Sequence, residues 1–208
     1  THAVEHLGCD FFLIDSLNGD QIRQKERRNL IGYNGSISKE AFVGQSSWTT
    51  TLGIQYRQDL TRGSELSHTR NRSETLENYK LGNVNELNAS LYADELITLD
   101  RFTINAGVRV DYFRDRYQDL LQQPATTQQA GDAIVSPKVN LYYTVNPRLQ
   151  LYLNSGKGFH SNDTRVVVPQ AGKQILPGAY GSDLGIILKP FPKMFISAAA
   201  WYLWMQQE

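Results

Sequence analysis

The chain has 208 residues, of which 40% are hydrophobic and 20% are charged, with 21 Lys and Arg against 21 Asp and Glu. This hydrophobic content excludes a disordered chain, and a formal net charge of zero argues against a protein whose main task is to bind nucleic acid. No stretch reaches the roughly 18 apolar residues of a membrane-spanning helix. A membrane β-barrel stays open, because the strands of such barrels alternate in polarity.

The N-terminal residues 1–9 have neither the basic start nor the apolar stretch of a signal peptide. Either the mature protein is cytoplasmic or the true beginning of the chain is missing. The single Cys9 has no partner in the chain, so cysteine usage leaves the redox compartment open. The first expected strand covers 10–16 and precedes Asn18-Gly19, which is a strong hairpin signal.

Alternating polarity with a period of two continues along the chain and predicts one strand after another. The expected strands lie within 31–37, 52–57, 86–94, 101–116, 137–145, 149–154, 184–188 and 194–206. The clearest is 101–116, where Phe102, Val108 and Tyr112 share an apolar face and Arg109 and Asp111 lie on the opposite, polar face. Its apolar face runs for about 11 residues, the length of a tilted strand that crosses a bilayer.

The last segment, 194–206, contains Ala198-Ala199-Ala200 and has good helix propensity. We interpret it as a strand because a proline-rich turn precedes it and because Trp201, Tyr202 and Trp204 suit an interfacial aromatic belt. Ordinary core packing is the alternative explanation of these aromatic residues.

The connections between the expected strands alternate between short and long. Short connections are expected at 39–44, 99–101, 145–148 and 189–193, and long ones at 60–83, 117–133 and 160–180. An up-and-down sheet with tight turns at one end and large loops at the other has this layout, as outer-membrane barrels do. The sequence therefore predicts an all-β fold, an antiparallel up-and-down meander of about nine strands that forms part of a large transmembrane β-barrel.

One segment, Ser-Gly-Lys-Gly-Phe-His-Ser-Asn-Asp-Thr-Arg at 155–165, resembles the strand-to-loop segment of TonB-dependent outer-membrane receptors. Other segments similar to the same family follow one another in the expected order, at 24–28, 55–59, 106–111, 136–140 and 176–181. The resemblance runs from about residue 10 to residue 208. It implies a parent protein with a signal peptide, an N-terminal plug domain and a barrel of roughly 22 strands.

Against that family pattern, we expect residues 1–208 to be a partial barrel domain, without plug domain, signal peptide or barrel-closing C-terminal strand. The resemblance implies a receptor in the outer membrane of a Gram-negative cell, which binds a scarce solute such as an iron chelate and imports it with TonB-derived energy. The implied partners are outer-membrane lipid, the plug domain of the same full-length chain, the TonB complex and a small-molecule solute, with no nucleic acid.

The long loops are the expected ligand contacts. The candidate substrate-binding residues are Arg62, His68, Arg70, His160, Asn162, Asp163 and Arg165. For the loop 60–83 the alternative is a solvated loop face, because Glu65, Glu74 and Glu77 offset its cations. For 160–165 the alternative is a structural hydrogen-bond network that holds the loop.

No residue is expected to be catalytic, and no cofactor or metal is expected. The four histidines lack metal-ligand spacing, and Gly156-Lys157-Gly158 lacks the rest of a phosphate-binding loop. We therefore expect a protein that is not an enzyme. Two alternative functions stay open, a passive outer-membrane channel or adhesin barrel, and a soluble all-β module such as a carbohydrate-binding sandwich.

Overall fold

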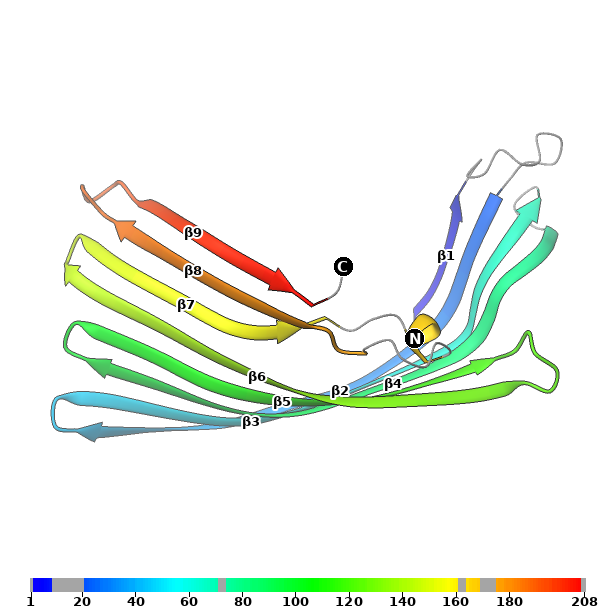
Figure 1. Ribbon diagram of the computed structural model, residues 1–208, viewed down its shortest axis with the longest axis horizontal. Helices are drawn as coiled ribbons and strands as arrows, with labels where there is room; N and C mark the ends of the chain where they lie inside the picture. Colours follow the sequence, from blue (N-terminus) through cyan, green and yellow to red (C-terminus); the bar gives the residue numbers. More distant parts are fainter. Residues whose placement is uncertain (1, 9–20, 71–73, 161–163, 169–174, 207–208) are drawn as a thin grey trace.

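A computed structural model of the chain contains one antiparallel sheet of nine strands, in which every strand pairs with its neighbours in sequence (Figure 1). It describes residues 2–8, 21–70, 74–160, 164–168 and 175–206. The elements are β1 (His2–Gly8), β2 (Gln21–Val43), β3 (Ser46–Arg70), β4 (Glu74–Leu99), β5 (Phe102–Asp119), β6 (Thr126–Asn146), β7 (Leu149–Phe159), α1 (Thr164–Val167), β8 (Gly178–Leu188) and β9 (Ile196–Met205). The predicted all-β meander is thus confirmed.

The sheet curves into a trough, with α1 lying on its concave side (Figure 1). The strands β1 and β9 form its two edges. Because β1 covers His2–Gly8, it lies ahead of the first strand expected from the sequence. The expected strand at 10–16 and the turn at Asn18-Gly19 lie outside the described residues. Within the described part of the chain, no helix is long and apolar enough to cross a membrane.

The strands β2, β3 and β4 are far longer than expected, with 23, 25 and 26 residues. The prediction of a long loop over 60–83 is wrong, because β3 continues to Arg70 and β4 begins at Glu74. Cross-strand pairs hold this polar extension together: Arg23 lies 2.6 Å from Glu65, and Arg70 lies 2.7 Å from Glu74. The loop expected over 117–133 is also shorter than predicted, because β5 continues to Asp119 and β6 begins at Thr126.

The opposite end of the sheet has the short turns that the sequence predicts. Asp100 has φ 43° and Gly44 has φ 64°, so both turns place a residue in the left-handed region. The turn expected at 39–44 consists of Gly44 and Gln45 alone, because β2 continues to Val43. The interpretation of the last segment as a strand is confirmed by β9, although it begins at Ile196.

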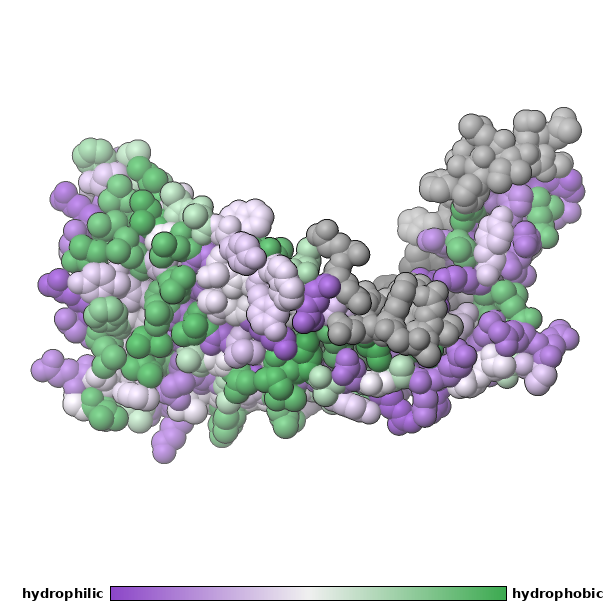
Figure 2. Space-filling view, viewed as in Figure 1, coloured by the Kyte–Doolittle hydropathy of each residue, from purple (hydrophilic) through white to green (hydrophobic). Residues whose placement is uncertain are grey.

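The two faces of the sheet differ as expected. On β5, Asp111 and Asp115 are 1% and 2% exposed on the concave face, whereas Val108 and Tyr112 are 43% and 47% exposed on the convex face. Figure 2 shows apolar residues gathered toward the short-turn end and hydrophilic residues toward the end with the longer connections. A convex belt of exposed apolar side chains beside a polar concave wall is the arrangement of a membrane barrel.

A row of tyrosines marks one border of this belt. Tyr33, Tyr56 and Tyr112 form one row across the convex face, because Tyr33 pairs with Tyr56 and both Tyr56 and Tyr112 pair with Ala89. Two residues farther along β5, the convex side chain is Arg114. Tyrosines at a border between apolar and charged side chains are typical of a membrane interface.

The segment between β7 and β8 folds back onto the concave face. Its Ile175 and Leu176 are buried with Ile134, and Phe113 and Phe159 pack against them. Val168, just after α1, is buried with Val84 and Tyr117. These small clusters attach the segment to β4, β5 and β6 and bring α1 over the upper part of the wall.

Candidate functional site on the inner wall

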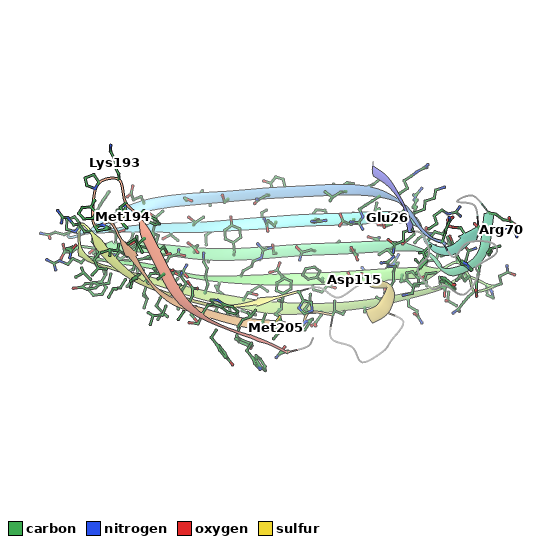
Figure 3. All side chains as sticks on the ribbon, turned by 90° about the horizontal axis from the view of Figure 1, so that it is seen from above. Glu26, Arg70, Asp115, Lys193, Met194 and Met205 are labelled. Atoms are coloured by element: carbon green, nitrogen blue, oxygen red, sulfur yellow. The ribbon has the colours of Figure 1, made fainter. Side chains whose placement is uncertain are left out.

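Three carboxylates form a row on the concave face, across three neighbouring strands. Asp59 of β3 pairs in register with Glu86 of β4, and Glu86 pairs with Asp115 of β5. Asp59 and Asp115 are almost fully buried. Figure 3 shows Asp115 beside the short helix, at the level where α1 crosses the wall.

Two neighbours offset part of this negative charge. Arg57 Nη2 lies 2.7 Å from Asp59 Oδ2, and the Thr164 hydroxyl donates a hydrogen bond of 2.5 Å to Glu86 Oε1. These residues line a pocket of about 290 Å³. We define the acid site as Arg57, Asp59, Glu86, Asp115 and Thr164. With its excess of carboxylate oxygens it is suited to hydrogen-bond donors and cationic groups.

Asp115 lies above the apolar belt, since the outward-facing neighbours on either side of it are Arg114 and Arg116. Burial and the nearby charge of Glu86 raise the pKa of Asp115 to about 6, although a hydrogen bond with Thr164 acts in the opposite direction. Asp115 Oδ1 has no hydrogen-bond partner among the described residues. Protonation near neutral pH would therefore relieve repulsion inside the acid site.

A second pocket, of about 480 Å³, lies lower on the same face. Lys138 Nζ lies 2.7 Å from Asp94 Oδ2, and Arg109 Nε lies 2.8 Å from Asp111 Oδ2. Asp111 is 1% exposed, and Arg109 donates to both of its carboxylate oxygens. These pairs give the wall a polar surface with little net charge.

The expected ligand residues on β3 occupy different places. Arg62 is exposed beside an irregularity of the β3–β4 pairing and faces the convex side. His68 stacks on Tyr79 with ring centroids 6.4 Å apart, and Arg70 forms an ion pair with Glu74 at the far end of the hairpin. The structure therefore separates Arg62 from the concave acid site.

The expected residues after β7 lie nearer the acid site. Arg165 of α1 donates from Nη1 to Ser64 Oγ at 3.2 Å, which ties this segment to β3 across the wall. His160 is exposed at the end of β7, and its backbone N donates to the Pro177 carbonyl. Asn162 and Asp163 lie outside the described residues.

The acid site itself was not predicted from the sequence. Alternation assigns Glu86 to the polar face, but which carboxylates share a level depends on strand register, which a single sequence does not reveal. Among the described residues, no group of three or more His, Cys, Asp or Glu side chains is arranged to hold a metal ion.

With this wall in view, the comparisons with known proteins decide the family. The family model described as "TonB dependent receptor-like, beta-barrel" matches residues 9–192. The chain belongs to this family. The resemblance noted around residues 155–165 is thereby confirmed, and the family is one of transporters and not of enzymes.

Solved structures of this family share the fold. The unliganded ferric citrate transporter FecA is 15% identical with a TM-score of 0.79 over 90% of this chain, and the ferric-catecholate import receptor Fiu from Escherichia coli K12, in its closed form, is 13% identical with a TM-score of 0.65 over 88%. The ferric yersiniabactin uptake receptor FyuA from Yersinia pestis is 14% identical with a TM-score of 0.61 over 89%.

The chain spans only 30%, 32% and 31% of these three proteins. At such low identity the likeness shows the fold alone, a segment of barrel wall. A comparison with curated protein sequences found no match.

Proposed function

We propose that this chain forms part of the barrel wall of an outer-membrane receptor that binds a scarce small solute and imports it with TonB-derived energy. The observation that carries the proposal is the match of the receptor family model to residues 9–192. The convex apolar belt and the polar concave wall support a place in the outer membrane. A plug domain and the TonB complex are the proposed partners.

An iron chelate is the proposed solute class. FecA, Fiu and FyuA are receptors or transporters of ferric citrate, ferric catecholates and ferric yersiniabactin, and the likeness of their folds to this chain supports the same solute class. The segment after β7 is the proposed contact, because Arg165 and His160 lie on it and it covers the acid site. Asn162 and Asp163 belong to the same proposed contact, and His68 and Arg70 supply more distant contacts along β3.

The test is growth and iron uptake of a strain that lacks the complete gene. Under iron limitation we expect loss of growth on one or more ferric chelates, restored by the wild-type gene, and uptake of radioactive iron that stops when the proton gradient is collapsed. Unchanged uptake in the deletion strain for every chelate tested would reject the solute class. Uptake that continues without the proton gradient would reject the TonB-driven mechanism and favour a passive channel.

A substitution at Arg165 tests whether the segment after β7 contacts the chelate. Arg165→Gln removes a charge from the segment over the acid site, whereas Arg148→Gln removes the same charge from a short turn at the opposite end of the sheet. We expect Arg165→Gln to weaken chelate binding by about tenfold, the typical effect of losing one charged hydrogen bond. Arg148→Gln should leave binding unchanged, and equal affinities of both variants would contradict the assignment.

A further inference from the structure

The convex apolar belt has aromatic side chains at both of its borders. One border is the row of tyrosines described above, which meets β4 at Ala89. At the short-turn border Phe102 pairs with Leu99 of β4 and packs on Tyr143, with ring centroids 4.7 Å apart. The stretch of β4 from Ala89 to Leu99 covers about 25 Å along the membrane normal at a typical strand tilt, which is the height of the apolar band of an outer-membrane barrel.

Two charged side chains lie inside this belt. Lys39 of β2 pairs with Thr50 of β3, and Thr50 pairs with Glu95 of β4, so one row carries both charges on the convex face. Glu95 is six residues from Ala89 and four from Leu99, and therefore lies near the middle of the belt. On the convex face of the described strands β2 to β6, no other charged side chain lies between the two aromatic borders.

These two charges are not paired with an opposite charge in the described parts of the chain. The Thr50 hydroxyl donates to Glu95 Oε2 at 2.7 Å, whereas Glu95 Oε1 has no hydrogen-bond partner among the described residues. Lys39 is exposed, and no ion pair of the described residues includes Lys39 or Glu95. A charged group that faces lipid tails is costly, because nothing there replaces its hydration. Lipid headgroups lie at the borders of the belt and not at this depth.

An apolar hollow of about 650 Å³ adjoins this row on the same face. Its lining includes the small residues Gly35 and Ala93, and Ala93 lies two residues from Glu95 and pairs with Val108. The larger side chains around it are those of Tyr33, Ile37, Leu52, Ile54, Leu91 and Val110. Small residues on a membrane-facing surface allow a second protein surface to approach closely.

A second copy of this chain supplies the missing partner of each charge. Strands lie about 4.8 Å apart, so Lys39 and Glu95 are about 10 Å apart along their row, with Thr50 midway between them. A two-fold axis along the membrane normal near Thr50 therefore places Lys39 of one copy opposite Glu95 of the other, and symmetry creates the same pair again. Strand tilt offsets the two residues in depth by about 6 Å, which a lysine side chain can span.

From this charge pattern we propose that the convex surface around Lys39, Thr50 and Glu95 binds a second copy of the chain in the outer membrane, with two Lys39–Glu95 ion pairs across the interface. The hollow beside the row receives apolar side chains of the partner copy. The interface rests on the proposed outer-membrane location and is independent of the solute class and of the energy source. Because it uses the convex face, each copy keeps its own concave wall.

A disulfide across the axis tests this interface in outer membranes. Leu52 is the next convex residue after Thr50 on β3 and is exposed, so its two copies should lie close together. We expect Leu52→Cys, in the complete protein with its native cysteines replaced by serine, to form a disulfide-linked pair of copies on mild oxidation. Leu151→Cys places a thiol in the same belt on β7, outside the interface, and should stay monomeric. Two differently tagged copies in one linked product identify the partner.

Charge reversal tests the ion pairs themselves, with native mass spectrometry of the complete protein in a mild detergent as the measure of dimerisation. We expect Lys39→Glu alone and Glu95→Lys alone to weaken dimerisation about 100-fold, because each places two like-charge contacts in the interface. The two single variants, produced with different tags in one cell, should dimerise with each other like wild type, because the mixed pair has opposite charges at both contacts. Lys193→Glu, in an exposed short turn, is the control and should dimerise like wild type.

Several outcomes would overturn the proposal. Leu52→Cys that stays monomeric, or that links to a different protein, is one, and single charge variants that dimerise like wild type are another. Loss of dimers in both single variants without recovery in the mixture would assign the two charges to a pair within one chain. If a charge variant did not reach the outer membrane, Leu52→Cys would decide, since it leaves both charges in place. Wild type that did not fractionate with outer membranes would instead reject the proposed location, which distinguishes the two failures.

Discussion

The hydroxyl of Thr164 donates a hydrogen bond of 2.5 Å to Glu86 Oε1, joining residues 78 positions apart in the chain. This contact holds the segment after β7 on the wall, together with the packing of Val168 against Val84 and Tyr117. A four-residue helix has little stability of its own, so its position depends on these contacts.

The first prediction concerns this hydrogen bond. Thr164→Val removes the donor while keeping the shape of the side chain, which should weaken attachment of the segment by about 1 to 3 kcal/mol because the half-buried Glu86 carboxylate loses its hydrogen-bond donor. Trypsin cleavage after Arg165 in the complete protein measures this attachment. Thr164→Ser keeps the donor and should be cleaved like wild type; equal cleavage of Thr164→Val and Thr164→Ser would contradict the role of the hydroxyl.

The same attachment should depend on pH. The pKa of Asp115 is raised from 3.8 to about 6 by burial and by the charge of Glu86. Glu86 of β4 and Thr164 of α1 face Asp115, and its partner on β6 is the uncharged Ala130. Because the folded form then binds more protons between about pH 4 and 6, the stability contributed by Asp115 falls as pH rises through that window and stays low above it.

We therefore expect trypsin cleavage after Arg165 to be faster at pH 7.5 than at pH 5.5, relative to Asp115→Asn measured at the same pH. Asparagine resembles the protonated carboxyl and should keep the segment attached at both pH values. A ratio of wild type to Asp115→Asn that does not change with pH would rule out this linkage.

A second prediction on the wall concerns a buried ion pair. Arg109→Ala leaves Asp111, which is 1% exposed, without its two hydrogen bonds from the guanidinium. Removing one partner of a buried pair typically costs 3 to 5 kcal/mol, and we expect about 3 kcal/mol because Arg109 is itself partly exposed. Urea unfolding of the complete protein in detergent gives the value. Arg109→Ala/Asp111→Asn should recover part of the loss, and a double variant no more stable than Arg109→Ala would argue against an unpaired charge.

The two faces of the sheet predict opposite tolerance to charge. Val108→Arg places a guanidinium in the convex apolar belt and should impair membrane assembly by about 2 to 4 kcal/mol. Gln55→Arg, on the polar face opposite Asn34 and Ser90, should assemble normally. The amount of each variant in outer-membrane fractions is the measurement, and similar losses for both would mean that the faces are assigned wrongly.

Acid should loosen the far end of the β2–β3–β4 extension. Burial raises the pKa of Glu65, but hydrogen bonds from Ser67 and Arg23 outweigh it, so that the pKa lies below its ordinary 4.5. The stability from Glu65 is thus present above pH 4.5 and is lost as pH falls through the lowered pKa. Fluorescence of Tyr79→Trp should report a transition below pH 4.5, and Glu65→Gln should remove it. A transition unchanged by Glu65→Gln would assign the loss to other groups.

Much of the fold could be predicted because alternating polarity can be recognised within a single strand, without knowing which strands pair with it. Val108 and Asp111 were assigned to opposite faces from β5 alone, and both assignments are confirmed. The turn at Asp100 was found in the same way. These features depend only on local sequence and on the need to separate apolar from polar side chains.

The lengths of β3 and β4 were not predicted. The extension beyond Leu60 is polar on both faces, so its sequence does not alternate between apolar and polar residues. It is held by cross-strand partners such as Arg23 and Glu65, which lie 42 residues apart in the chain. The acid site was missed for a related reason. Asp59, Glu86 and Asp115 meet through register, and Thr164 reaches them from a segment that resembled an ordinary loop.

The unequal strand lengths give the mouth of this wall a slope. The β3–β4 hairpin continues for 14 residues beyond Tyr56, roughly 45 Å along the strand, whereas β7, which ends at Phe159, and β8, which begins at Gly178, stop well short of that hairpin (Figure 1). A solute that approaches from the β3–β4 side contacts the polar extension of these two strands before it reaches the acid site. On the β7–β8 side, the described residues that stand above these strand ends belong to the attached segment, so loss of its contacts with Glu86 and Ser64 would lower this side of the wall further.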